Sequence, residues 1–197
     1  MLRALSSIIF PDVVLPVAET TAGQGVLILK EDDDASKIKK LKIMDVGVNS
    51  FAFTLDHKVN KTDKKVPCFK QLSSYFHPEN DVGINKGCDL VLFTQFRGIW
   101  YALMLDMKSK RPDRVATERQ LQNSELFVKY VCSLANAYYP DAESLVFHYM
   151  KAYITTNMHR NGVYKARKQP SSEYLSVSVE VNDHQEASVH LGKLLGQ

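Results

Sequence analysis

The pattern of apolar and polar residues is clearest in the middle of the chain. Two apolar runs, residues 88–94 and 99–107, are joined by the short polar segment of residues 95–98, which contains a glycine. Apolar runs of this length on either side of a glycine-containing turn are typical of strands. The pattern therefore predicts a β-hairpin or two adjacent strands.

Apolar residues spaced three and four apart predict a helix before this pair of strands and another after it. Residues 67–76 have this spacing, and the proline and polar residues of 77–81 end the helix. A longer helix is predicted over residues 115–138, after a turn at residues 111–113. The stripe along one face of this helix consists of Gln120, Phe127, Val131 and Leu134.

The last third of the chain contains two further candidate strands. Residues 145–154 form an apolar run, and residues 174–181 alternate between apolar and polar positions. The segment between them, residues 157–170, is basic and contains a glycine, so it is predicted as a loop. Residues 192–197 are interpreted as a short helix or a frayed end.

The first third of the chain favours strands. Residues 26–29 and 51–55 are short apolar segments, and the acidic residues 31–34 are interpreted as a solvated loop rather than a metal site. We therefore expect a β-rich N-terminal lobe of residues 1–65 that packs on a core of residues 66–197. The expected fold class is α/β, with a mixed central sheet flanked by helices.

Composition narrows the class of protein. Hydrophobic residues make up 45% and charged residues 24% of the 197 residues, as in ordinary globular proteins. The net charge of +3 permits nucleic-acid binding without indicating it. Cys68, Cys88 and Cys132 form no CxxC pair, which argues against a disulfide framework and a structural zinc site. No apolar run approaches the roughly 18 residues that span a bilayer, and the first residues do not resemble a secretory signal. We expect a soluble, cytoplasmic protein with no membrane association.

Charged residues at the ends of the two central strands carry the candidate chemistry. Asp106 and Lys108 lie two residues apart in a strand, so their side chains point to the same face. Asp89 opens the preceding strand, and whether it lies beside Asp106 depends on the register of the two strands. A buried carboxylate is costly unless a cation or hydrogen bonds compensate it. Two neighbouring carboxylates would suit a hard cation such as Mg²⁺.

The motif resembles the active-site signature of the PD-(D/E)xK, or restriction-endonuclease-like, nuclease superfamily. Asp89 is followed after a spacing of 17 by Asp106-x-Lys108. The predicted order of helix, strand, strand, helix and strand over residues 67–154 is similar to the α-β-β-α-β core of that superfamily. Gln120 on the long helix also fits the resemblance, because in several branches such a glutamine approaches the metal site.

The resemblance implies a metal-dependent nuclease that hydrolyses phosphodiester bonds, in DNA rather than RNA. Asp89 and Asp106 would hold Mg²⁺ or Mn²⁺, with the Met107 carbonyl as a third oxygen ligand. Lys108 would orient or deprotonate the attacking water, and Gln120 would steady the site. Small nucleases of this kind serve as effectors in prokaryotic antiviral defence. The small size and mild charge favour a homodimer or a partner protein that supplies targeting.

Two departures from the family pattern leave alternatives open. Cys88 stands where the family name implies proline, and residues 67–76 lack the glutamate that the first core helix often contributes. Glu79 is the best substitute for that glutamate, followed by Asp81 and then Glu19. One alternative is a non-catalytic subunit that keeps the fold and binds nucleic acid or forms a complex. Another is an unrelated α/β protein in which Asp-x-Lys is coincidental.

Overall fold

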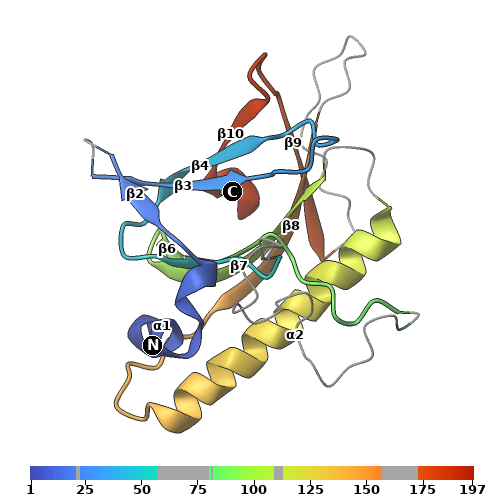
Figure 1. Cartoon of the computed structure of the whole chain (residues 1–197). Coiled ribbons are helices and arrows are strands. Elements are labelled where there is room, and N and C mark those ends of the chain that lie inside the picture. The colour runs from blue at the N-terminus through green and yellow to red at the C-terminus, as the bar shows by residue number, and fades with distance from the viewer. Residues whose placement is uncertain (21–22, 57–79, 81, 109–112, 157–172) are drawn as a thin grey trace.

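The computed structural model describes most of the chain and leaves five segments without a description (Figure 1). The described residues are 1–20, 23–56, 80, 82–108, 113–156 and 173–197. The predicted helix of residues 67–76 and the basic loop of residues 157–170 lie outside these ranges. Glu79 and Asp81, two of the substitutes expected for the helix acid, also lie outside them.

A six-stranded mixed sheet forms the centre of the molecule, which confirms the expected α/β class. In spatial order its strands are β1 (Val14–Leu15), β5 (Phe51–Phe53), β6 (Leu90–Phe96), β7 (Ile99–Lys108), β8 (His148–Thr156) and β9 (Tyr174–Val179). In this order β1, β5, β6 and β7 pair antiparallel, and β7, β8 and β9 pair parallel. The predicted hairpin is therefore confirmed as β6 and β7, with a turn at Arg97 and Gly98.

A second sheet of four strands lies over one face of the first. Its order is β10 (Glu186–His190), β4 (Lys40–Val46), β3 (Gly25–Lys30) and β2 (Val17–Glu19). The strands of the N-terminal third are thus divided between the two sheets, and β10 pairs parallel with β4 at the far edge. A bulge in β4 gives Asp45 a positive φ of 63°, and its carboxylate lies 2.6 Å from Nδ1 of His190.

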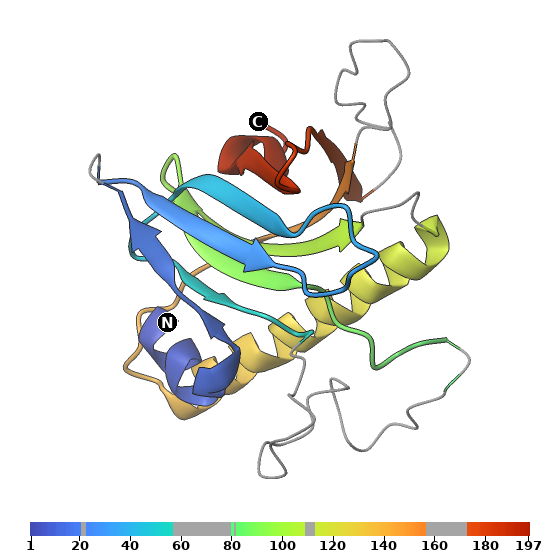
Figure 2. The same cartoon turned by 45° about the horizontal axis from the view of Figure 1, so that its top comes forward.

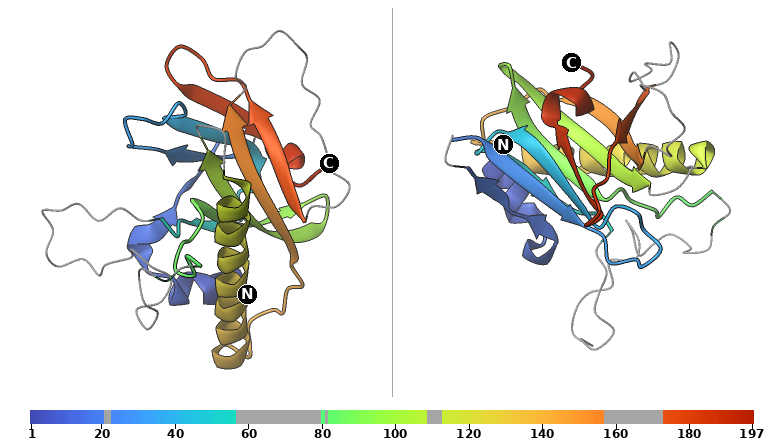
Figure 3. Two further views of the ribbon diagram at one scale, coloured as in Figure 1. Left: turned by 90° about the vertical axis from the view of Figure 1, so that its right-hand side faces the viewer. Right: turned by 90° about the horizontal axis from the view of Figure 1, so that it is seen from above.

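Helices cover the opposite face of the central sheet (Figures 2 and 3). They are α1 (Leu2–Ile8) and the long α2 (Arg114–Tyr138), whereas the short α3 (Leu191–Leu194) packs on the side of the second sheet. Successive side chains of β6 and β7 point to opposite faces of the central sheet, so these two strands contribute to the packing on both faces. Val91, Phe93, Ala102 and Met104 face the helices, and Leu90, Leu92, Leu103 and Leu105 face the second sheet.

The long helix begins where its sequence provides a cap. The side chain of Asp113 accepts a hydrogen bond of 3.2 Å from the backbone N–H of Ala116, which satisfies a free donor of the first turn. The buried face of α2 lies about one residue around the helix from the predicted stripe, because Phe127 and Leu134 are only half-buried. The buried positions include Thr117, Ser124 and Glu125, polar residues that a search for apolar spacing passes over.

The structure differs from the sequence prediction at two further elements. The helix α1 was not predicted, and its buried residues Ala4 and Leu5 pack in the same cluster as residues of α2. The strand predicted from residue 145 begins at His148, whose side chain is exposed.

A buried ionic network joins α2 to the parallel strands. Nζ of Lys151 on β8 lies 2.5 Å from Oε2 of Glu125 on α2, and both side chains are buried. Nζ of Lys129 lies 2.6 Å from the other oxygen, but its side chain is 49% exposed. Burial alone would raise the pKa of Glu125, yet the two ammonium groups outweigh this effect and lower it below its ordinary value.

We find no helix in the described ranges that combines the length and the apolar composition needed to cross a membrane.

The ionic network leads to a first prediction. Lys151→Ala leaves the buried carboxylate of Glu125 without its internal partner and should lower the free energy of unfolding by about 3–5 kcal/mol. Lys129→Ala removes a solvent-exposed partner of the same carboxylate and should cost less than about 1 kcal/mol. Urea unfolding followed by circular dichroism measures both. Equal losses in the two variants would contradict the assigned role of Lys151.

Candidate metal centre

The register of the central hairpin brings Asp89 and Asp106 together. Leu90 pairs with Leu105 at the end of the β6–β7 ladder. The next position along the same register sets Asp89 directly opposite Asp106. Both carboxylates lie on the α2 face of the sheet, because their neighbours Val91 and Met104 pack there. Side chains opposite one another on an antiparallel pair are in contact distance.

Asp106 is the most deeply buried member of the site, with 1% of its surface exposed. Its Oδ1 accepts a hydrogen bond of 3.2 Å from Nε2 of Gln120. Its Oδ2 lies 2.6 Å from Nζ of Lys108, an ion pair between residues on the same face of β7. The ammonium group of Lys108 therefore already compensates this oxygen, and a metal ion at Oδ2 would have to share it with Lys108.

Asp89 is half-buried at the entrance to β6. Its Oδ2 accepts a hydrogen bond of 2.5 Å from the backbone N–H of Met107. Burial raises the pKa of Asp89 well above its ordinary value, and the negative charge of Asp106 raises it further. The Met107 N–H and the Lys108 ammonium oppose this effect without cancelling it. Burial likewise raises the pKa of Asp106, despite the adjacent Lys108 and a hydrogen bond with Asp89.

Gln120 connects the helix to both charged residues of β7. Its amide nitrogen donates to Asp106 and to the backbone carbonyl of Gly87, and its Oε1 accepts a hydrogen bond of 3.2 Å from Lys108. An amide has both donors and acceptors, so one side chain can hold an acid and a base together. The structure therefore brings together the four residues expected from sequence: Asp89, Asp106, Lys108 and Gln120.

Two neighbours of Gln120 on α2 hold the segment that leads into β6. Oγ of Ser124 accepts a hydrogen bond of 2.9 Å from the N–H of Cys88, and Asn123 donates one of 2.9 Å to the carbonyl of Gly83. Burial raises the pKa of the Cys88 thiol to about 12, so this residue remains an uncharged thiol in the core. The polar residues of α2 thus determine where Asp89 stands.

A third carboxylate, Asp56, was missed by the sequence analysis. It follows β5, the strand next to β6, and its negative charge is among the causes that raise the pKa of both Asp89 and Asp106. The apolar segment of residues 51–55 could have indicated it. That segment was assigned to an N-terminal lobe, whereas in the structure it pairs with the strand that Asp89 precedes.

The remaining candidates lie elsewhere or supply backbone only. Glu19 is exposed on β2 of the second sheet, whereas Asp89 and Asp106 belong to the central hairpin. The side chain of Met107 packs toward the second sheet, and its N–H holds Asp89. Arg114 is exposed and pairs with Glu118 one turn later, at 2.7 Å.

The donor set suits a hard cation. Carboxylate oxygens are the ligands that Mg²⁺ and Mn²⁺ prefer, and a divalent ion would relieve the repulsion between Asp89 and Asp106. At Oδ2 of Asp106 such an ion would share the oxygen with the Lys108 ammonium group, which lies 2.6 Å away. Within the described ranges, no three His, Cys, Asp or Glu side chains are already close enough to enclose an ion. The fit therefore rests on the facing pair.

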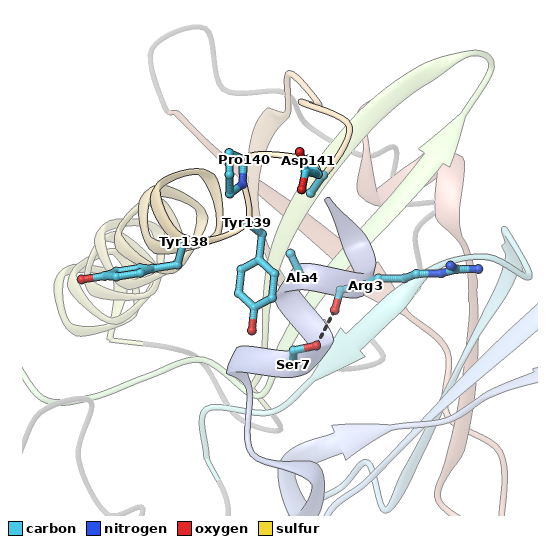
Figure 4. Close-up of a pocket in the computed structure, with 8 residues that line it drawn as sticks. Arg3, Ala4, Ser7, Tyr138, Tyr139, Pro140 and Asp141 are labelled. Carbon is cyan, nitrogen blue, oxygen red and sulfur yellow. Dashed lines mark hydrogen bonds between the residues drawn. The ribbon is translucent and has the colours of Figure 1, made fainter.

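A separate pocket of about 360 Å³ lies where α1 meets the end of α2 (Figure 4). Arg3 and Ser7 from α1 line it, together with Tyr138 to Ala142 at the end of α2. None of the four motif residues contributes to it. The charged residues in its lining are one arginine and one aspartate, both exposed, so the pocket has fewer candidate catalytic or metal-binding groups than the end of the hairpin.

The raised pKa of Asp89 leads to a second prediction. A carboxyl group whose pKa is higher in the folded than in the unfolded protein makes a contribution to stability that depends on pH. The contribution is complete when the pH is below the pKa of the unfolded state, and it is lost as the pH rises through the pKa of the folded state. Without metal, Asp89→Asn should therefore raise the free energy of unfolding at pH 7, by on the order of 1 kcal/mol. The gain should disappear below about pH 4.

Thermal unfolding in EDTA across this pH range measures the difference between Asp89→Asn and the wild-type protein. Asn can still accept the hydrogen bond from Met107, so the substitution removes charge and keeps that contact. Asp45→Asn, on the second sheet, is the matched control and should give no gain at pH 7. A loss of stability in Asp89→Asn at pH 7 would contradict the electrostatic account.

Comparisons with protein-family models, with curated proteins and with solved structures find no match to this chain.

Proposed function

We propose that the chain is a divalent-metal-dependent nuclease that hydrolyses phosphodiester bonds of nucleic acid. The observation that carries the proposal is the facing pair of Asp89 and Asp106, with Nζ of Lys108 at 2.6 Å from a buried carboxylate oxygen of Asp106. An acid pair and an ammonium group converging at the end of a buried hairpin are costly to fold. A site of this kind is more often functional than structural.

Each residue has a distinct task in this proposal. Asp89 and Asp106 would hold Mg²⁺ or Mn²⁺, with the Met107 carbonyl as a further oxygen ligand. The bound ion supplies positive charge that stabilises the phosphate as negative charge develops on it. Lys108 would orient the attacking water as an ammonium group, because its side chain is 28% exposed and so can reach a water molecule. Gln120 would keep Lys108 and Asp106 in place.

The arrangement of elements supports membership of the restriction-endonuclease-like class. The order β6, β7, α2 and β8 over residues 90–156 corresponds to the strand, strand, helix and strand part of the expected core. The proposal is also supported by the closeness of Asp106, Lys108 and Gln120, which are joined by an ion pair and hydrogen bonds. Residues 67–76, the expected first core helix, lie outside the described ranges.

DNA is the proposed substrate, in preference to RNA. The net charge of +3 provides little non-specific attraction to a phosphate backbone. We therefore propose that targeting comes from a second copy of the chain or from a partner protein, in a cytoplasmic antiviral defence system. This context follows from the resemblance of the motif to small effector nucleases.

The second candidate function is a non-catalytic subunit that keeps the nuclease fold. The ion pair between Lys108 and Asp106 favours it, because at 2.6 Å the ammonium already compensates the buried charge without a metal. Such a subunit would bind nucleic acid or form a complex, and it would show no metal dependence. The two candidates differ in one measurable property, which is cleavage that requires a divalent ion.

Cleavage of supercoiled and linear DNA, with single-stranded RNA in parallel, is the decisive test. With Mg²⁺ or Mn²⁺ the wild-type protein should cut DNA, and EDTA should abolish the activity. Asp106→Asn and Lys108→Ala should each lower the rate at least about 100-fold, as expected for groups that act on the transition state. Gln120→Ala should lower it about tenfold, because it supports these groups indirectly.

Matched controls separate the site from general damage. Asp45→Asn and Lys129→Ala change the same residue types away from the four motif residues and should retain activity. Cleavage that survives both Asp106→Asn and Lys108→Ala would refute the assigned site. A folded wild-type protein that cuts no substrate and takes up no Mn²⁺ would favour the non-catalytic subunit.

A further inference from the structure

The outer side of the long helix α2 carries large apolar side chains. Val115 and Leu126 are each 58% exposed, and Tyr130 is 59% exposed. Residues eleven apart lie almost in line along an α-helix, because eleven residues make about three turns. Val115 is therefore in line with Leu126, and Arg119 is in line with Tyr130. Ala137 follows Leu126 at the same spacing. We name these five residues the outer stripe.

The outer stripe faces away from the central sheet. Leu121, Val128 and Ala135 lie on the opposite side of the helix and are fully buried. In Figure 1 the helix runs along the outside of the molecule. A helix with apolar residues on both of its sides is usually covered on both. The outer stripe therefore has the character of a contact surface.

The charges along the outer side of α2 differ between its two ends. Arg119 belongs to the outer stripe near the start of the helix, whereas Asp141 and Glu143 follow the end of the helix, and all three are exposed. Arg114 and Glu118 at the first end pair with each other at 2.7 Å, so their charges compensate one another. The surface is thus basic at one end, apolar in the middle and acidic at the other end.

We propose that the outer stripe is the contact between two copies of this chain, which pack with their α2 helices antiparallel. A two-fold dimer uses the same surface on both copies, so this surface must be complementary to itself. Antiparallel packing centred near residue 128 sets Leu126 of each copy against Tyr130 of the other. It also brings Arg119 of each copy toward Asp141 of the other, whereas parallel packing would set like charges together.

The size of the contact predicts a weak dimer. The 25 residues of α2 form a helix about 38 Å long, and a strip about 11 Å wide along it has an area of roughly 400 Å². A standard interface buries about 800 Å² on each partner. We therefore expect the dimer to dissociate when the protein is diluted.

The contact leaves the candidate metal centre outside it. Gln120 projects from another side of α2, toward Asp106 and Lys108 on the central sheet. The proposed function names a second copy of the chain as one source of targeting, and this dimer forms without a metal ion. The dimer and the metal-dependent activity can therefore be tested separately.

Sedimentation equilibrium of the whole chain in EDTA, at increasing protein concentration, tests the proposal. The wild-type protein should pass from monomer to dimer as its concentration rises. Leu126→Glu places a charge at the centre of the contact twice in each dimer, so it should weaken association at least about tenfold. Val48→Glu makes the same kind of change at a residue that is 44% exposed between β4 and β5, and it should associate like the wild-type protein.

Reversal of charge tests the antiparallel orientation. Arg119→Glu and Asp141→Arg should each weaken association about fivefold, because two exposed ion pairs are lost from each dimer. The double variant Arg119→Glu/Asp141→Arg should recover the affinity of the wild-type protein, since the pair is present again with its signs exchanged. A double variant that associates more weakly than either single variant would overturn the proposal.

Two further results would also overturn it. A wild-type protein that stays monomeric at every concentration would leave the outer stripe to solvent or to a different protein. A dimer that Leu126→Glu does not weaken would have to use another surface. Neither result bears on the metal centre, because DNA cleavage that requires Mn²⁺ could still be observed in the monomer. Circular dichroism shows whether the variants fold, as expected for exposed positions.

Discussion

The antiparallel register between β6 and β7 is the constraint on which the candidate site depends. It sets Asp89 opposite Asp106 and turns both carboxylates, with Lys108, toward α2. A slip of one residue would exchange the two faces of a strand, so the acid and the lysine would move into the core between the sheets. The apolar residues of both strands oppose such a slip, because each face of the hairpin is packed against its own layer. The packing that stabilises the fold and the geometry of the candidate site therefore depend on the same strand register.

The long helix contributes polar side chains where a core helix would ordinarily present apolar ones. Gln120, Asn123 and Ser124 hold the strand ends near the site, and Glu125 joins the helix to β8 through Lys151. Buried polar groups of this kind cost desolvation and repay it only when their partners are in place. They therefore specify one position of the helix along the sheet, which apolar packing alone would leave less defined.

The elements with strong local patterns could be predicted from the sequence. The hairpin, α2 and the strands near residues 148–156 and 174–179 follow from apolar runs and helical spacing. The four motif residues followed from a short motif because three of them belong to these elements and Asp89 directly precedes β6. Asp56 was missed because its place depends on the pairing of β5 with β6, which the apolar segment of residues 51–55 does not specify by itself. The second sheet was missed for the same reason: its order joins residues from both ends of the chain.

The pairing of β10 with β4 has a consequence for how the molecule is made. Lys40 and Glu186 are 146 residues apart in the chain, yet they form a hydrogen-bonded ion pair across the edge of the second sheet. Contacts between such distant residues close late in folding, because a large loop must be ordered before they form. During synthesis from the N-terminus, the edge of β4 that pairs with β10 therefore stays unpaired until residues 186–190 have been made. An unpaired strand edge can pair with another chain, so β10 protects β4 from association through that edge.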